Sequence, residues 1–142
     1  MNVLGFNFIK ISAERAKRLE NVKINTKIEF KDPTKEDSKL LNNQELFNFP
    51  FTYNIRYNSE DPKTKKEEAQ ASIVFEGIVL VSGTKEETKD IIKNWKSQES
   101  ESSFKTGIIN TIIHKCTVKA LSIEEEINLP THINLPRVKI DN

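Results

Sequence analysis

Few side chains in this sequence are of the types that carry out chemistry, and their spacing argues against a shared site. His114 and Cys116 form the pair that would most simply bind zinc or act as a catalytic dyad. A zinc site would need further ligands, such as His132 and a carboxylate from Glu124 or Glu125. On a helix, however, residues two apart point about 200° away from each other. We therefore expect a small core cysteine beside a solvated histidine, with no metal and no cofactor.

The acidic and glycine residues also fail to form a catalytic pattern. Three consecutive glutamates at positions 124–126 could supply paired carboxylates, but neighbouring helical positions fan around the axis. We expect them on a solvated helix flank. Four isolated glycines fit no nucleotide-binding loop; they are Gly5, Gly77, Gly83 and Gly107. The sequence thus predicts no catalytic residues and a non-enzymatic function.

Charge, apolar runs and cysteine content limit the cellular location and the binding partners that we expect. A net charge of +1 gives no field that would attract nucleic acid or an anionic membrane. Apolar runs such as 78–81 are far shorter than the roughly 20 residues that cross a bilayer, so we expect no membrane insertion. Cys116 has no cysteine partner, and residues 1–11 lack the features of a signal peptide, which favours a cytoplasmic location. At 142 residues, the chain is expected to form one domain.

The most regular segment is residues 47–57, where apolar and polar side chains alternate as in a long β-strand. One face of this strand is aromatic and apolar: Phe47, Phe49, Phe51, Tyr53, Ile55 and Tyr57. Pro50 lacks an amide donor, so we expect it where the ladder is unpaired or on an edge strand. The aromatic face has two interpretations. It is either core covered by the chain's own helices, or a partly open groove for extended apolar peptide.

Three further strands are predicted around it. Residues 3–11 alternate at Leu4, Phe6 and Phe8, followed by a short helix or loop over 12–20, and residues 22–30 alternate cleanly. A loop over 31–45 precedes the aromatic strand, which forms a hairpin with residues 69–81. Near its end this returning strand is apolar on both faces, with Ile78 and Leu80 on the second one. We expect that second face to be covered by other segments or by another subunit.

Helices are predicted in the C-terminal half. Thr84 and Glu87 form a capping box for a helix to about residue 96, whose buried stripe is Ile91, Ile92 and Trp95. After a polar break at 97–103, a longer helix should begin near residue 103. Its expected apolar face is Ile109, Ile112, Ile113, Cys116, Ala120, Ile123 and Ile127. A second capping pattern at 122–125 would let this helix bend or stop near residue 121.

The last segment carries two prolines, each preceded by leucine, which predicts an extended arm. The side chains expected to pack are Leu129, Ile133, Leu135 and Val138. Together these elements predict an α+β fold: an antiparallel sheet of about four strands, two or more C-terminal helices and an extended tail.

This order of elements resembles the export chaperone SecB and its relatives over residues 22–135. The most specific likeness is IINTIIHKCTVKALSIEEEINLP, a long helix that leads into an extended leucine-proline segment. The resemblance implies a homo-oligomer, a dimer or tetramer built through sheet edges and helices, that holds unfolded polypeptide without ATP in apolar grooves. Its interface or groove is expected to be lined by Phe47, Phe49, Phe51, Tyr53, Ile78, Leu80 and Trp95.

The sequence departs from that family in two ways, since it lacks a strongly acidic surface and its end, PRVKIDN, has no cysteine–histidine zinc tail. A role in protein transport would need such a tail for docking on the export motor, whereas a general chaperone, a dedicated chaperone of one partner or an adaptor would not. The lysine-, isoleucine- and asparagine-rich composition indicates an archaeal source with an AT-rich genome. The alternative is a nucleic-acid module in which two tyrosines stack on bases and three lysines contact phosphate. Those residues are Tyr53, Tyr57, Lys63, Lys65 and Lys66.

Overall fold

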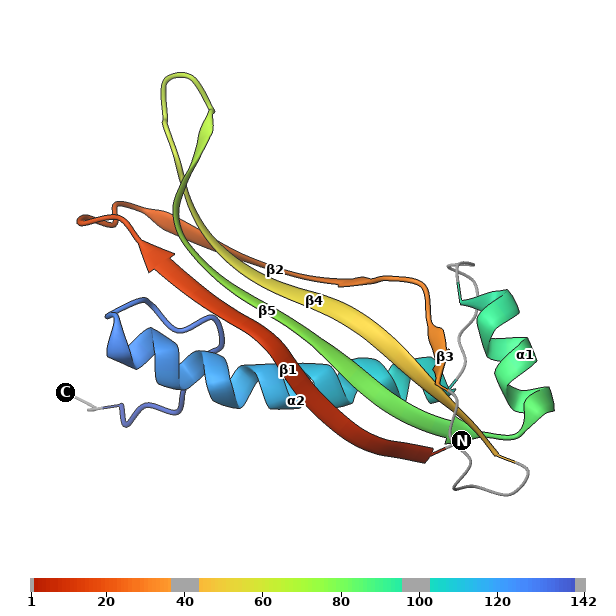
Figure 1. Cartoon of the computed structure of the whole chain (residues 1–142). Helices are drawn as coiled ribbons and strands as arrows, with labels where there is room; N and C mark the ends of the chain where they lie inside the picture. The colour runs from red at the N-terminus through yellow and green to blue at the C-terminus, as the bar shows by residue number, and fades with distance from the viewer. Residues whose placement is uncertain (1, 37–43, 96–102, 140–142) are drawn as a thin grey trace.

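The computed structural model describes residues 2–36, 44–95 and 103–139, and these form a sheet followed by two helices and an arm (Figure 1). The described strands are β1 (Asn2–Arg15), β2 (Val22–Phe30), β3 (Thr34–Glu36), β4 (Glu45–Glu60) and β5 (Glu67–Gly83). The described helices are α1 (Lys85–Asn94) and α2 (Ser103–Glu126). The predicted α+β class is confirmed, and β3 is a strand that the sequence pattern did not indicate.

All strand pairs in the described sheet are antiparallel, and the order is β1-β5-β4-β2, with β3 beside β4. β2 has the predicted bounds, whereas β4 and β5 are longer than predicted. Their hairpin extends well beyond the other strands (Figure 1). Its turn is closed by the Asp61 amide, which donates to the Lys66 carbonyl at 3.1 Å.

Pro50 lies at a gap in the ladder on the side of β4 that pairs with β2 and β3. Its carbonyl accepts a hydrogen bond from the Lys31 amide at 3.0 Å, so its nitrogen faces the same side of β4. On that side β2 ends at Phe30 and β3 begins at Thr34. The missing donor therefore interrupts no strand pair, which confirms the first of the two alternatives. The edge-strand alternative is wrong, because β4 lies inside the sheet.

β1 is an edge strand with two irregularities. Its register with β5 shifts at Leu4 and at Ile9, and both side chains are exposed. Phe6 and Phe8 pack against the core as the alternation predicted, but the expected burial of Leu4 is wrong because it sits in the bulge. The strand continues to Arg15, so the predicted short helix is absent and only a loop follows.

Helix α1 begins as the capping box predicted. The Thr84 hydroxyl oxygen accepts a hydrogen bond from the Glu87 amide at 3.3 Å, which satisfies a free donor of the first turn. Ile91 packs against the core, whereas the expected burial of Ile92 is wrong. Thr88 is buried in this helix instead. The predicted polar break at 97–103 lies almost entirely outside the described residues.

Helix α2 is continuous, so the predicted bend or stop near residue 121 is wrong. It ends where Asn128 adopts a left-handed backbone conformation with φ of 55°. The Leu129 amide then donates to the Glu124 carbonyl at 2.8 Å, and the Asn128 amide donates to the Glu125 carbonyl at 3.4 Å. This is the hydrogen-bond pattern of a Schellman motif, which satisfies the last carbonyls of the helix.

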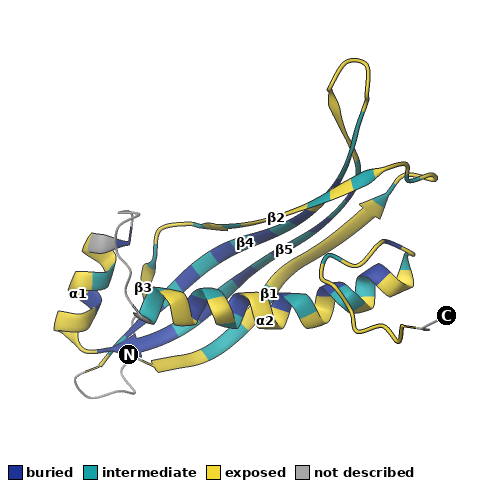
Figure 2. Ribbon diagram, turned by 180° about the vertical axis from the view of Figure 1, so that it is seen from behind, coloured by how far each residue is buried: buried dark blue, intermediate teal, exposed yellow. Residues whose placement is uncertain are grey.

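The core lies between α2 and one face of the sheet (Figure 2). The helix contributes a fully buried stripe with a residue at every fourth position: Ile108, Ile112, Cys116, Ala120 and Glu124. Two residues of the predicted stripe are misplaced, because Ile109 is half-buried and Ile113 is exposed. In the sheet, β4 and β5 present every second residue to this core, among them Ile73, Phe75, Val79 and Val81.

The opposite face of the sheet carries the second apolar set of β5. Ile78 and Leu80 are half-buried there, and Leu80 lies between Gly5 on β1 and Asn48 on β4. No helix among the described residues lies over this face, because α2 runs along the other one (Figures 1 and 2). Within the described residues, the chain's own helices therefore do not cover this face.

Candidate functional site

The aromatic residues predicted to line a groove are buried in the core. Phe47, Phe49, Phe51, Tyr53 and Trp95 are each 7% exposed or less. The chain's own helix covers this face, so the core interpretation is correct and the open aromatic groove does not describe it. Of the seven predicted residues, only Ile78 and Leu80 remain partly accessible, and they lie on the other face of the sheet.

Trp95 joins the end of α1 to the sheet and to α2. Its ring lies 4.6 Å from the ring of Phe49 and 5.1 Å from that of Phe30, measured between centroids. The Lys105 ammonium group lies 5.2 Å from the Trp95 ring centroid and donates to its carbonyl at 3.3 Å. Trp95 is therefore a packing residue, which places the short helix α1 at one end of the core.

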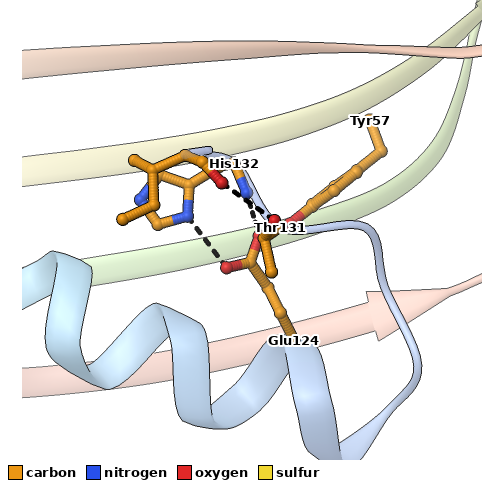
Figure 3. Close-up of polar contacts among 5 residues, drawn as sticks. Tyr57, Glu124, Thr131 and His132 are labelled. Atoms are coloured by element: carbon orange, nitrogen blue, oxygen red, sulfur yellow. Dashed lines mark hydrogen bonds and ion pairs between the residues drawn. The ribbon is translucent and has the colours of Figure 1, made fainter. Parts of the chain in front are cut away.

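The most unusual polar feature is a buried cluster of Tyr57, Glu124 and His132, referred to below as the Glu124 cluster (Figure 3). The Tyr57 hydroxyl of β4 donates to Oε2 of Glu124 on α2. The backbone amide of His132, in the arm, donates to the same oxygen at 2.8 Å. The His132 ring nitrogen Nδ1 lies 2.8 Å from Oε1 of the same carboxylate. One carboxylate thus joins the sheet, the helix and the arm.

Burial dominates the electrostatics of this cluster. Tyr57 and Glu124 are completely buried. Removal from water raises the pKa of Tyr57 well above its usual value, and its hydrogen bond to the Glu124 carboxylate raises that pKa further. The other ring nitrogen of His132, Nε2, is buried without a hydrogen-bond partner among the described residues. The expected solvated position of Glu124 is therefore wrong.

The Glu124 cluster does not have the arrangement of a catalytic site. The Tyr57 hydroxyl is directed into the core and is held by Glu124, so it does not face a cavity where a substrate could react. Arg15 holds the neighbouring chain from β1, because its Nη1 donates to the Ile127 carbonyl at 2.9 Å and to the Asn128 carbonyl at 2.7 Å. The arrangement fixes where the arm leaves α2.

A hollow of about 390 Å³ lies beside the arm, between β2 and α2, and is called the β2–α2 hollow below. Its wall combines apolar and polar side chains from four segments: Thr26, Lys27, Ile28, Tyr53, Ile113, Thr117, His132 and Ile133. Ile113 is 40% exposed, although it lies on the helix that covers the core. Apolar surface is therefore accessible next to an edge strand.

A second hollow of about 580 Å³ lies between α1, α2 and the start of β1. Its wall includes Val3, Ile91 and Phe104, and Gly107 adds no side chain to it. A Cβ atom at Gly107 would meet no other atom within 4 Å, so the helix surface is open at this point. This hollow is also largely apolar.

The remaining candidate residues do not converge. Cys116 is completely buried and His114 is exposed, as the helical geometry predicted. Burial raises the pKa of Cys116 to about 12, which keeps it a neutral thiol. Within residues 2–36, 44–95 and 103–139, no three histidine, cysteine or acidic side chains are grouped to hold a metal ion. Within the same ranges, no helix has the length and apolar character to cross a membrane.

The nucleic-acid alternative loses its stacking residues. Tyr53 and Tyr57 are buried under α2, so neither ring is available to a base. Lys63 and Lys65 are exposed in the hairpin turn, but the aromatic rings of β4 are all buried. The described structure therefore does not bring the predicted stacking and phosphate-binding residues into one surface.

The architecture is a distant SecB-like fold. The chain matches no protein-family model and no curated protein. Among solved structures, it is similar to the SecB-like chaperone Rv1957 of Mycobacterium tuberculosis, described in complex with a ChAD peptide from the HigA1 antitoxin Rv1956. The TM-score is 0.52 at 11% sequence identity, over 99% of this chain and 92% of that chain. At this identity the likeness shows the fold alone, and the archaeal source stays a prediction.

Proposed function

We propose that this protein is a non-enzymatic chaperone or peptide-binding protein that holds unfolded or extended polypeptide on an apolar surface. The observation that carries the proposal is the β2–α2 hollow, which lies beside an edge strand and has the apolar side chains of Ile28, Ile113 and Ile133 in its wall. The distant similarity to a SecB-like chaperone that is described in complex with a peptide supports the same function.

The edge strand β2 offers a way to bind extended chain. β2 pairs with β4 on one side, and among the described strands it has no neighbour on the other. An extended peptide can add to such an edge through backbone hydrogen bonds, while alternate side chains enter an adjoining pocket. The adjoining pocket here is the β2–α2 hollow, where Ile28 and Ile113 provide apolar contact.

The first experiment measures whether the purified protein suppresses aggregation of a chemically unfolded client without ATP. A charge placed in the hollow by Ile113→Asp should abolish most of this activity, because burying an unpaired carboxylate against the client is costly. Val118→Asp is the matched control, since Val118 is exposed on the same helix and does not line the hollow. If the wild-type protein holds no client, or if both variants behave alike, the proposed site is wrong.

A homo-oligomer, a dimer or a tetramer, is part of the proposal. Its support is the partly exposed apolar pair on the uncovered sheet face, Ile78 and Leu80, and the edge strand β1 with its exposed Leu4 and Ile9. Light-scattering chromatography gives the native mass. Changing Ile78 and Leu80 to serine should lower that mass while circular dichroism shows an intact fold. An unchanged oligomer would remove this face from the interface.

A dedicated chaperone or adaptor for one partner would use the same hollow but would ignore general clients. The aggregation assay distinguishes a general from a dedicated chaperone, because a general chaperone protects several unrelated unfolded proteins. We also propose a cytoplasmic location and the absence of catalytic activity, and neither follows from the fold.

A further inference from the structure

The C-terminal arm, residues 129–139, contacts the hollow that is proposed to bind clients. Its first part is attached at Leu129, which is buried, and at His132, which makes two contacts with the Glu124 carboxylate, both at 2.8 Å. Ile133 follows directly and lines the β2–α2 hollow together with Ile28 and other residues. The Thr131 hydroxyl donates to the Ile133 carbonyl at 2.8 Å, which fixes the turn between them (Figure 3).

The rest of the arm is loosely attached. Residues 134–139 are all exposed, and Val138 is 94% exposed. Within the described residues they form no helix or strand. Attachment of the arm beyond the helix cap therefore depends on a few contacts, chiefly those of His132 and Ile133. Few contacts mean a small free-energy cost of local detachment.

The bound part of the arm offers two groups that a client would also have. The His132 backbone amide donates a hydrogen bond to the Glu124 carboxylate, and the apolar side chain of Ile133 lines the hollow. An unfolded polypeptide would offer the same two groups at neighbouring residues. The arm and a client would therefore compete for the same surface beside β2.

We propose that residues 131–133, which form one wall of the β2–α2 hollow at His132 and Ile133, act as a built-in competitor that narrows the hollow until a client displaces them. This inference rests on the proposed function and adds regulation of the same site. A hollow narrowed in this way lowers the fraction of molecules that are ready to bind, so the apparent affinity for clients falls by that fraction. Weakening the arm should raise the affinity without creating any new contact.

The experiment compares Ile133→Ser with Val138→Ser in the full-length chain. Both changes replace an apolar side chain of the arm by serine, but only Ile133 lines the hollow. Binding is measured by fluorescence anisotropy with a labelled, permanently unfolded polypeptide. Hydrogen exchange of residues 129–139, followed by mass spectrometry, reports whether the arm is attached.

Ile133→Ser should bind the unfolded polypeptide about 5-fold more tightly than wild type, while Val138→Ser should equal wild type. In the wild-type protein, the client should speed exchange of the His132 amide, because its hydrogen bond to Glu124 is lost. A synthetic peptide of sequence LPTHINLPRVK should compete with the client on Ile133→Ser.

Three results are decisive. If wild type binds and Ile133→Ser binds equally or more weakly, Ile133 is not a competitor and the inference is wrong, although the proposed function stands. If the client leaves exchange of the arm unchanged, displacement does not occur and the inference is also wrong. If neither wild type nor Ile133→Ser binds the client, the proposed function fails and the inference fails with it.

Discussion

Removing the Tyr57 hydroxyl tests the Glu124 cluster with a minimal change. Tyr57→Phe keeps the aromatic ring in the core and deletes the donor that contacts Oε2 of Glu124. The same oxygen keeps its hydrogen bond from the His132 amide at 2.8 Å. The substitution therefore removes one of the two donors to a completely buried carboxylate oxygen.

The expected loss follows from the value of such a bond. Hydrogen bonds to charged groups contribute about 1.5–3 kcal/mol, and we take about 2 kcal/mol because the second donor remains. For 142 residues the entropy of unfolding at the midpoint is about 300 cal/mol/K, so each 1 kcal/mol lowers the melting temperature by about 3.4 °C. Tyr57→Phe should melt about 7 °C below wild type.

The assay is thermal and urea unfolding followed by circular dichroism. Tyr53→Phe is the control, since Tyr53 lies on the same buried face and its hydroxyl interacts with the neutral Thr26 side chain. Tyr53→Phe should lower the free energy of unfolding by about 1 kcal/mol. In a double-mutant cycle with Glu124→Gln, the Tyr57 and Glu124 changes should couple by more than about 0.5 kcal/mol. A Tyr57→Phe variant as stable as wild type, with no coupling, would refute the structural role of the cluster.

Two further predictions concern titratable groups. Cys116, with its pKa raised to about 12 by burial, should not react with a thiol reagent at pH 8 in the native protein and should react fully in denaturant; rapid native labelling would mean that α2 does not cover the sheet. Burial raises the pKa of both Tyr53 and Tyr57 in the folded state. Above about pH 10 the unfolded chain loses these protons while the folded chain keeps them, so the free energy of unfolding should fall as pH rises. Urea unfolding at pH 8, 10 and 11 checks this, and an equal stability at all three values would contradict it.

Much of the fold could be predicted from the sequence because periodicity records which faces are buried. Strands β2 and β4 alternate clearly and β5 alternates in its first half, and each was located to within a few residues. Helix α1 was located from its cap, Thr84 with Glu87. The short strand β3 has no such signal, since its three residues are exposed and are fixed only by pairing with β4.

The polar cluster could not be predicted by hydropathy, because its buried member is a glutamate. The position of Glu124 has a signal all the same: it continues the series of every fourth residue from Ile108 to Ala120. Sequence patterns assign a charged residue to the surface, and its partners, Tyr57 and His132, lie 67 residues before it and 8 residues after it. Long-range pairing of this kind follows from the packing of α2 on the sheet and not from local spacing.

For the aromatic strand β4, the apolar face could be predicted from the sequence, but whether another element covers it could not. Alternation identified its apolar face correctly, but the same pattern describes a core and an open groove. The deciding fact is the path of α2, which covers that face and leaves the β2–α2 hollow at its side. The accessible apolar residue Ile113 was assigned to the core because it lies four residues after Ile109 and three before Cys116, but it is exposed.

The strand order has a consequence for how the chain is made. β1 pairs with β5, so the first strand to leave the ribosome waits for residues 67–83 before it can pair. The aromatic face of β4 waits in the same way for α2, which is the last of the described helices and strands to be synthesised. At roughly 5–20 residues per second, these surfaces stay open for several seconds during translation. A ribosome-bound chain that ends before α2 would therefore expose the kind of apolar strand that the finished protein is proposed to hold.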